Sequence, residues 1–256
     1  RFQLPDNVVH LEVHYLHEPQ SKPPVIKRKG NAQVFKEIRC LHDQYRHADS
    51  PKTEMASLLA SIMKHRNEGR YAEADFLYSR ESWDYITEQY RERCTDPSFV
   101  DYFWTVRIMH SPLWKLMALT ESFIPVKVFH TISTGYAGFL GALMKQRTGK
   151  PLILSEHGIY TKERKIDLFQ AEWIRDNRGT LAKDSSEVAY FRHLWIRFFE
   201  ALGRDCYHHA DRIIALYETN RLRQIQDGAP AERTENIPNG INFPHLPCCD
   251  HSELNK

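Results

Sequence analysis

The chain has 256 residues, 41% of them hydrophobic and 12% aromatic, which suffices for one large domain or two small ones with a substantial core. Its 35 basic and 33 acidic residues leave a formal net charge of +2, so nothing in the composition calls for nucleic acid or an anionic membrane as a partner. The five cysteines form no C-x-x-C pair, which favours free thiols in a reducing compartment. The longest uncharged run, 128–144, is shorter than the roughly 20 apolar residues of a membrane span, so we expect a cytoplasmic protein.

The first half of the chain is dominated by helical patterns. Residues 8–14 alternate apolar and polar side chains and predict a strand, and a Pro/Ser/Lys linker follows at 18–24. Between 30 and 120 the apolar spacing predicts helices over 32–47, 53–67, 71–78, 82–93 and 99–120. Asp96 before Pro97 is typical of a helix start with proline in the first turn.

Strand and helix patterns alternate from about residue 124. They lie at 126–129, 135–147, 152–155, 168–175, 186–209, 212–216, 218–226 and 235–237. Gly228 is well placed to end the helix that precedes it. This alternation predicts βαβ units and a parallel sheet, and therefore an α/β fold.

The strongest candidate site directly follows the apolar run 151–154. The next residues include two carboxylates, an imidazole, a phenol and a guanidinium, which belong to Glu156, His157, Tyr160, Glu163 and Arg164. In an open α/β sheet, ligands bind in the loops after the carboxyl ends of the strands. A core strand needs none of these groups, and burying them without partners costs several kcal/mol. We therefore expect this loop to form a site.

A second candidate loop follows the strand predicted to end at Phe129. It contains His130, Ser133 and Thr134, whose hydroxyl groups are expected to cap the next helix. Glycines then recur every third residue from Gly135 to Gly141, near one face of that helix. Two interpretations stay open: close packing through the glycines, or contact of free backbone N–H groups with an anion or a sugar hydroxyl. The spacing is not the dinucleotide-binding G-x-G-x-x-G.

Several other groups have simpler explanations. The histidines at 10, 14 and 17 are better explained as a solvated strand edge than as a metal site. The His/Cys group at 245–251 lacks C-x-x-C spacing and is taken as a tail. Four tryptophans in helical patterns are expected to anchor the core or the contacts between helices: Trp104, Trp114, Trp173 and Trp195.

Two segments near the C-terminus carry a resemblance to a known family. The run Ala210-Asp211-Arg212-Ile213-Ile214-Ala215-Leu216, followed by Asn236-Ile237-Pro238-Asn239-Gly240, resembles the end of the N-terminal domain in retaining GT-B glycosyltransferases of family 4. With E-H-G-I-Y-T-x-E-R at 156–164 and F-H-T-I-S-T-G-Y-A-G at 129–138, the chain is similar to the PelF-type glycosyltransferases of Pel exopolysaccharide synthesis.

The resemblance implies an incomplete Rossmann-like N-terminal domain with a helix-rich insertion. Residues 1–29 would begin the Rossmann-like domain, 30–120 would form the insertion, 121–240 the Rossmann-like core, and 241–256 the start of the interdomain crossing or a tail. The family's first strand and glycine-rich acceptor loop would precede Arg1, and its E-x7-E pair would follow I-P-N-G. Glu73 and Glu81 share that spacing by coincidence, since they lie in the insertion. We therefore expect this chain alone to be inactive.

The function that the resemblance implies is retaining transfer of a sugar from a UDP-sugar to a growing exopolysaccharide. No metal or cofactor is implied beyond the UDP-sugar donor. His157 would contact the donor sugar as the catalytic residue, and Asn239 and Gly240 would lie at the interdomain crossing. The resemblance and the site chemistry together assign substrate binding to Glu156, Tyr160, Glu163, Arg164, Ser133, Thr134, Gly135 and His130.

The implied partners are the polysaccharide acceptor and membrane-embedded subunits of exopolysaccharide synthesis, which could recruit the protein to the inner membrane. The insertion is the candidate docking element because it carries aromatic residues that could serve either docking or its own core: Trp83, Tyr85, Tyr90, Tyr102 and Trp104. Two alternatives stay open, a GT-B sugar-nucleotide epimerase that moves protons with acidic residues, and a non-catalytic scaffold of an exopolysaccharide assembly.

Overall fold

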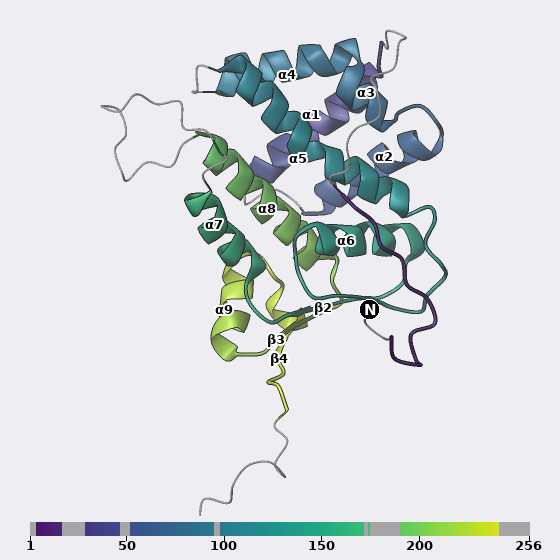
Figure 1. Cartoon of the computed structure of the whole chain (residues 1–256), viewed down its shortest axis with the longest axis vertical. Helices are drawn as coiled ribbons and strands as arrows, with labels where there is room; N and C mark the ends of the chain where they lie inside the picture. The colour runs from purple at the N-terminus through teal and green to yellow at the C-terminus, as the bar shows by residue number, and fades with distance from the viewer. Residues whose placement is uncertain are drawn as a thin grey trace, which may run out of the picture.

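A parallel four-stranded sheet lies at one end of the protein, below a larger group of helices (Figure 1). The computed structural model describes residues 4–16, 29–46, 52–94, 98–171, 174 and 190–240. The strands are β1 (Phe129–Thr131), β2 (Leu152–Glu156), β3 (Arg212–Ala215) and β4 (Thr234–Asn236), and they pair in that order. The predicted α/β class with a parallel sheet is therefore confirmed, and it fits a partial Rossmann-like domain.

Helices connect each strand to the next. These are α6 (Tyr136–Thr148), α7 (Tyr160–Gln170) with α8 (Tyr190–His209), and α9 (Glu218–Gln226), the last followed by a 3₁₀ turn at Ala231–Arg233. Sequential strand order with right-handed crossovers places these helices on the same face of the sheet. Burial along β2 agrees, because Leu152 and Leu154 are fully buried whereas Ile153 and Ser155 are only partly buried.

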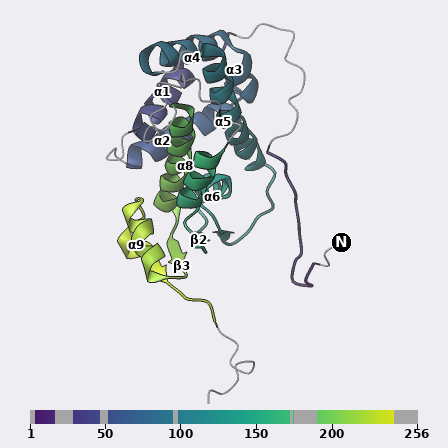
Figure 2. The same ribbon diagram turned by 60° about the vertical axis from the view of Figure 1, so that its left-hand side comes forward.

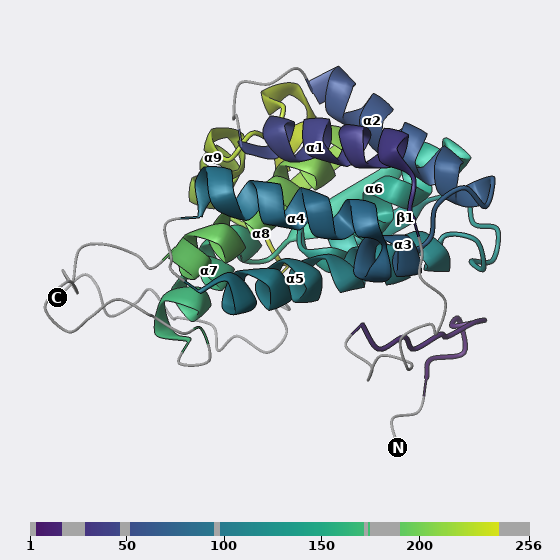
Figure 3. The same ribbon diagram turned by 90° about the horizontal axis from the view of Figure 1, so that it is seen from above.

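Residues 30–120 form the helical region that the sequence predicts. Its helices are α1 (Ala32–Arg46), α2 (Lys52–Asn67), α3 (Glu73–Tyr78), α4 (Arg80–Arg93) and α5 (Phe99–Leu119). Seen from above, α1, α4 and α5 lie side by side (Figure 3). The Ser98 hydroxyl caps α5 by accepting from the Asp101 amide at 3.2 Å, while the expected start at 96–97 lies outside the described residues.

Helix α8 joins the helical region to the sheet. It packs against α1 and α5 of the helical region and also against α6 and α7. Figure 2 shows α8 between the helical region above and the sheet below. One hydrophobic cluster consequently runs from Phe76 and Trp114 in the helical region to Phe139 in α6 and Trp195 in α8. A smaller cluster lies between the sheet and α8 and includes Leu154, Cys206 and Tyr207. None of the helices in the described ranges combines the length and apolar character that crossing a membrane requires.

The strand predicted at residues 8–14 is wrong. Val8 to Tyr15 run as irregular backbone, and their apolar side chains are exposed, with Val9 at 92%. An alternating pattern forms a strand only where a neighbouring strand pairs with it and a core covers one face, and the described residues offer this segment neither. His10 and His14 instead both contact the carboxylate of Glu12, at 2.6 and 2.9 Å. His17 lies outside the described residues.

Three further expectations about elements need correction. The strand predicted at 126–129 is β1 at Phe129–Thr131, because pairing with β2 begins where Phe129 meets Leu152. Of the segment predicted at 168–175, residues 168–170 form the end of α7, which begins at Tyr160, and most of the remainder lies outside the described residues. Trp104 is 52% exposed rather than a core anchor, although Trp114 and Trp195 are buried as expected. Trp173 lies outside the described residues.

Two buried histidines connect three helices of the helical region. Nδ1 of His110 lies 2.6 Å from the carbonyl oxygen of Val106, so this nitrogen donates and Nε2 of neutral His110 accepts. Nε2 of His42 lies 2.9 Å from Nε2 of His110 and therefore donates to it. Nδ1 of His42, 2.5 Å from the hydroxyl of Tyr85, then accepts. With both rings neutral, one arrangement of protons satisfies all three hydrogen bonds. We call these three side chains the His42–Tyr85–His110 relay.

Candidate functional site

The buried carboxylate of Glu156 organises the candidate site at the end of β2. Glu156 is 1% exposed. One of its oxygens accepts from the Tyr207 hydroxyl at 2.7 Å and from Nε2 of Gln224 at 3.0 Å. The other accepts from the Thr134 hydroxyl at 3.3 Å and from the Tyr160 backbone N–H at 3.4 Å. One carboxylate therefore ties β2 to α8, to α9, to the β1–α6 loop and to the first residue of α7.

The local sequence explains why Glu156 has this role. Strand residues alternate between the two faces, so Glu156 faces the same helices as Leu152 and Leu154. Burial raises the pKa of the Glu156 carboxyl, while hydrogen bonds from Tyr207 and Gln224 oppose that shift. The N-cap of α7, Ile159, has no side chain that can accept a hydrogen bond, and Glu156 takes over part of that function from the strand end.

His157 is exposed, immediately after this buried anchor. Its own backbone carbonyl accepts from Nδ2 of Asn220 in α9 at 3.5 Å. The backbone is therefore held both before the His157 side chain, at Glu156, and after it, at this carbonyl. The arrangement presents an exposed imidazole at the carboxyl end of the sheet on a fixed backbone. That is the position where parallel α/β folds bind ligands.

Gly158 and Glu163 fit together beside His157. A Cβ at Gly158 would overlap an oxygen of the Glu163 carboxylate, so the Glu163 side chain packs directly over this glycine and would have to move if a side chain were added. Glu163 also lies in the first turn of α7, where a negative charge is favourable near the positive end of the helix dipole. Glu163 is exposed, so it remains available at the rim of the site.

Tyr160 and Arg164 form a stacked support beneath the loop. Arg164 donates to the Tyr160 hydroxyl from Nε at 3.3 Å and from Nη2 at 3.2 Å, and its guanidinium lies 5.2 Å from the centre of the Phe199 ring. The Tyr160 ring packs edge-on against Phe199. A Cβ at Gly135 would overlap the Tyr160 ring. Both side chains are thus occupied in packing α7 onto α8 and onto the start of α6.

The β1–α6 loop contributes mainly through packing. The expectation that Ser133 and Thr134 cap α6 is wrong, because the N-cap is Gly135 and no side chain bonds there; the Thr134 hydroxyl is buried and reaches Glu156 instead. A Cβ at Gly138 would overlap the Ser133 carbonyl and Cys206, which supports the close-packing interpretation for this glycine. His130 lies within β1, paired with Ile153, and not in the loop as expected; it is exposed, with Nε2 2.9 Å from the Ser155 hydroxyl.

A hollow of about 320 Å³ opens between α7 and α9, next to the backbone of His157. Helix α9 lies below α7 in Figure 1. The walls of the hollow carry two cations, Lys162 from α7 and Arg223 from α9, and also include Ile159, Thr219, Asn220, Leu222 and Gln226. Arg223 is already paired with Asp227 at the end of the same helix at 2.9 Å, so Lys162 is the cation of this wall for which no ion pair is found among the described residues.

The structure brings together part of the predicted site. Glu156, Thr134, Tyr160 and Gly135 meet in one packed unit, with His157 exposed beside it. Asn239 and Gly240 follow β4 and are exposed, with no contact that ties them to this unit among the described residues. In the part of the chain that is described, no three His, Cys, Asp or Glu side chains are grouped to hold a metal ion.

Sequence reasoning missed three residues that hold the site. Tyr207, Gln224 and Asn220 come from α8 and α9, more than fifty residues beyond Glu156. Tyr207 sits in an apolar helical pattern that resembles ordinary core, and Gln224 in a pattern that resembles an exposed helix face. The one available signal was Glu156 itself, because a carboxylate at an inward position of a strand requires buried donors from elsewhere.

Most of the chain matches one known protein family. Residues 1–232 match the family model described as Domain of unknown function (DUF3492). No curated protein and no solved structure gives a significant match.

Proposed function

Because this chain belongs to the DUF3492 family, a domain found in GT-B glycosyltransferase-like proteins, we propose that it is the N-terminal part of a retaining glycosyltransferase. The full enzyme would move a sugar from a UDP-sugar to a growing exopolysaccharide, as the PelF-type enzymes that the chain resembles do. The observation that carries the proposal is the exposed His157, fixed through Glu156 and Asn220 at the carboxyl end of a parallel sheet.

The geometry suggests a division of roles within the proposed active site. His157 would contact the donor sugar, because its imidazole is exposed while the backbone on both sides is held. His130 and Glu163 would face the same cleft from the rim, since both are exposed. Tyr160, Arg164, Thr134 and Gly135 would position the loop rather than touch substrate, because they are used in packing.

Replacing His157 tests the proposal directly. In the full-length protein, His157→Ala is expected to lower the rate of sugar transfer from the preferred UDP-sugar at least about tenfold, a loss of roughly 1.4 kcal/mol of transition-state stabilisation. The thermal midpoint should stay within about 1 °C, because surface side chains away from packing contribute little to stability. Transfer would be followed with a panel of UDP-hexoses and UDP-N-acetylhexosamines, with His193→Ala, an exposed histidine on α8, as the matched control.

The same assay separates the alternatives. Conversion of one UDP-sugar into another without any acceptor would favour the epimerase. A full-length protein that consumes no UDP-sugar would favour the scaffold. Equal transfer rates for His157→Ala and the wild type would contradict the role of His157.

Docking to membrane-embedded subunits of exopolysaccharide synthesis is the second part of the proposal. Tyr85 and Tyr102 are buried in the helical region and drop out as docking residues, whereas Trp104 is exposed. On α5, Trp104 lies between Val100 and Ile108 at four-residue spacing, and all three are at least half exposed. An exposed apolar stripe of this kind suits an apolar partner surface.

Polar substitutions on α5 test the docking. The triple variant Val100→Ser, Trp104→Ser, Ile108→Ser is expected to move most of the full-length protein from the membrane fraction to the cytosolic fraction, with an unchanged helical circular dichroism spectrum. The control carries Ile166→Ser and Phe169→Ser, two exposed apolar residues on α7. Unchanged co-sedimentation of the α5 variant with the membrane would rule out this surface.

A further inference from the structure

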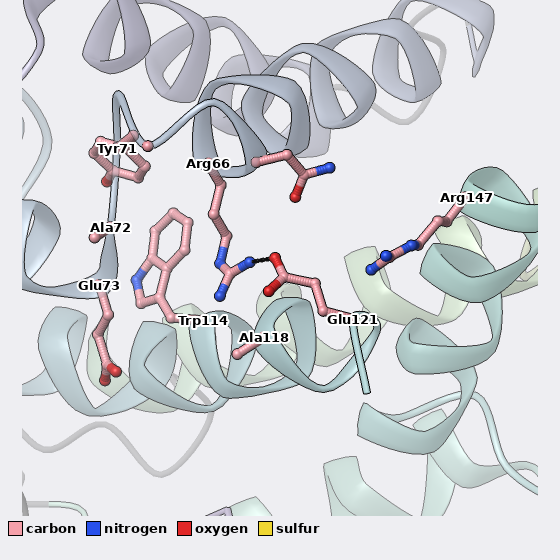
Figure 4. Close-up of a pocket in the computed structure, with 10 residues that line it drawn as sticks. Arg66, Tyr71, Ala72, Glu73, Trp114, Ala118, Glu121 and Arg147 are labelled. Carbon is pink, nitrogen blue, oxygen red and sulfur yellow. Dashed lines mark hydrogen bonds and ion pairs between the residues drawn. The ribbon is translucent and has the colours of Figure 1, made fainter. Parts of the chain in front are cut away.

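A second pocket lies at the opposite end of the sheet from His157. Helix α6 returns the chain from the end of β1 to the start of β2, and Arg147 in its last turn forms one wall. The other walls come from α2, α3 and α5 of the helical region and from the turns beside them (Figure 4). The volume is about 640 Å³, within the range typical of small-molecule sites.

Charged side chains of both signs line this pocket. Arg66 and Glu121 point toward one another and form an ion pair, and Arg147 reaches toward them from the other side (Figure 4). Arg147 donates to the Thr120 hydroxyl at 3.2 Å, and Glu73 accepts from the Ser111 hydroxyl at 3.3 Å. A guanidinium has five N–H donors and a carboxylate about four acceptor positions, so each of these groups retains unused bonding capacity.

Two aromatic residues of the same wall carry polar atoms without partners. The Tyr71 hydroxyl and Nε1 of Trp114 are buried, and neither has a hydrogen bond among the described residues. The two rings lie 5.3 Å apart at 68°. Both polar atoms are covered by protein, so the two rings contribute apolar surface to the wall rather than free donors. An aromatic wall of this kind suits the apolar face of a flat, ring-shaped ligand.

The mixture of charges decides which ligand fits. An inorganic anion would satisfy Arg66 and Arg147 but would lie against the carboxylates of Glu73 and Glu121. A cation would satisfy the two carboxylates but would lie against the two guanidinium groups. A hydroxyl group both donates and accepts, so a polyhydroxylated ligand can satisfy carboxylates and guanidinium groups together. From this geometry we propose that the pocket is a carbohydrate site, which takes a neutral sugar of one or two rings and is separate from the cleft at His157.

Such a ligand would bridge the two parts of the fold. Arg147 belongs to the sheet-forming part, whereas Arg66, Glu73 and Trp114 belong to the helical region. A sugar that contacts both walls binds the native fold and not the unfolded chain, so it raises the thermal midpoint as its concentration exceeds the Kd. The proposal does not depend on the proposed transferase activity.

The test uses the full 256-residue chain with cellobiose, lactose and N,N′-diacetylchitobiose as probes. Saturation-transfer NMR and thermal melting at millimolar sugar should show saturable binding of at least one disaccharide. Arg147→Gln and Glu73→Gln should each weaken it about tenfold, equal to about 1.4 kcal/mol. Arg212→Gln, which changes an exposed arginine on β3, should bind as the wild type does, and His157→Ala shows whether any of the binding takes place in the cleft instead. Circular dichroism of each variant checks that it is folded.

Three results would overturn the proposal. The first is that none of the sugars binds. The second is protection by phosphate or citrate but by no sugar, which would make the pocket an anion site. The third is binding that His157→Ala abolishes and Arg147→Gln leaves intact, which would place the sugar in the cleft, contradict this site and support the proposed function instead.

Discussion

Glu156→Ala is expected to lower the free energy of unfolding by about 3–5 kcal/mol. The substitution leaves the Tyr207 hydroxyl, the Gln224 amide and the Thr134 hydroxyl without their shared acceptor, and all three residues are fully buried. Each unpaired buried donor costs about 1–3 kcal/mol, and the missing side chain adds a cavity. Urea unfolding followed by circular dichroism measures the change.

Two variants sharpen the interpretation of this result. Glu156→Gln keeps the shape and one acceptor oxygen, so we expect it to cost less than half as much as Glu156→Ala. Glu163→Ala removes an exposed carboxylate seven residues along the chain, so we expect a change within about 0.5 kcal/mol. A loss below about 1 kcal/mol in Glu156→Ala would show that the four hydrogen bonds do not hold the site together.

Acidification is expected to destabilise the protein through the His42–Tyr85–His110 relay. Burial lowers the pKa of His110 from 6.5 to about 4, and burial together with the nearby His110 holds the pKa of His42 well below its usual value. The unfolded chain therefore binds more protons than the folded protein between about pH 6.5 and 4. Stability is complete above pH 6.5 and is lost as the pH falls through that window. For His110 the loss is about 3 kcal/mol, at 1.36 kcal/mol for each pKa unit.

Other titrating groups require a control for this experiment. His209 beside Asp205 has a raised pKa, as does buried Glu156, and both favour the folded state at lower pH. The control therefore carries His42→Gln and His110→Gln, which removes only the relay. The difference between the wild type and this double variant in urea unfolding at pH 7 and pH 4.5 isolates the effect. Parallel pH dependences of the two proteins would show that the relay does not titrate in this range.

The sequence predicted the elements whose signals are local. The end of α9 matches the prediction because Gly228, with φ +109°, follows its last turn. Strands β2 and β3 were found because both are short apolar runs that follow turn or capping residues. The start of α7 was missed because Gly158 and the polar residues around it resemble a loop, and because the group that completes the helix end is Glu156, in the preceding strand.

The rest of the site depends on contacts between distant parts of the chain. The residues around His157 could be selected from the sequence, since that many ionisable groups after a strand are unnecessary for a core. Their separate roles could not, because only packing shows that Glu156 is buried and His157 exposed. The strand predicted from the alternation at 8–14 was wrong for the same reason, because the residues themselves do not indicate whether a partner strand pairs with them.

The position of α8 has a consequence for how the protein folds. Contacts within the helical region, such as those of α1 with α2 and of α4 with α5, are close in sequence, and local contacts form fast. Pairing of β2 with β3 joins Ile153 to Arg212, so a long loop must close before that pairing is gained. Helix α8 lies inside this loop and also covers the core of the helical region. During synthesis, therefore, the helices up to α5 emerge with an apolar surface that α8 covers only after Tyr190–His209 has left the ribosome. Apolar surface that is exposed in this way during folding promotes aggregation.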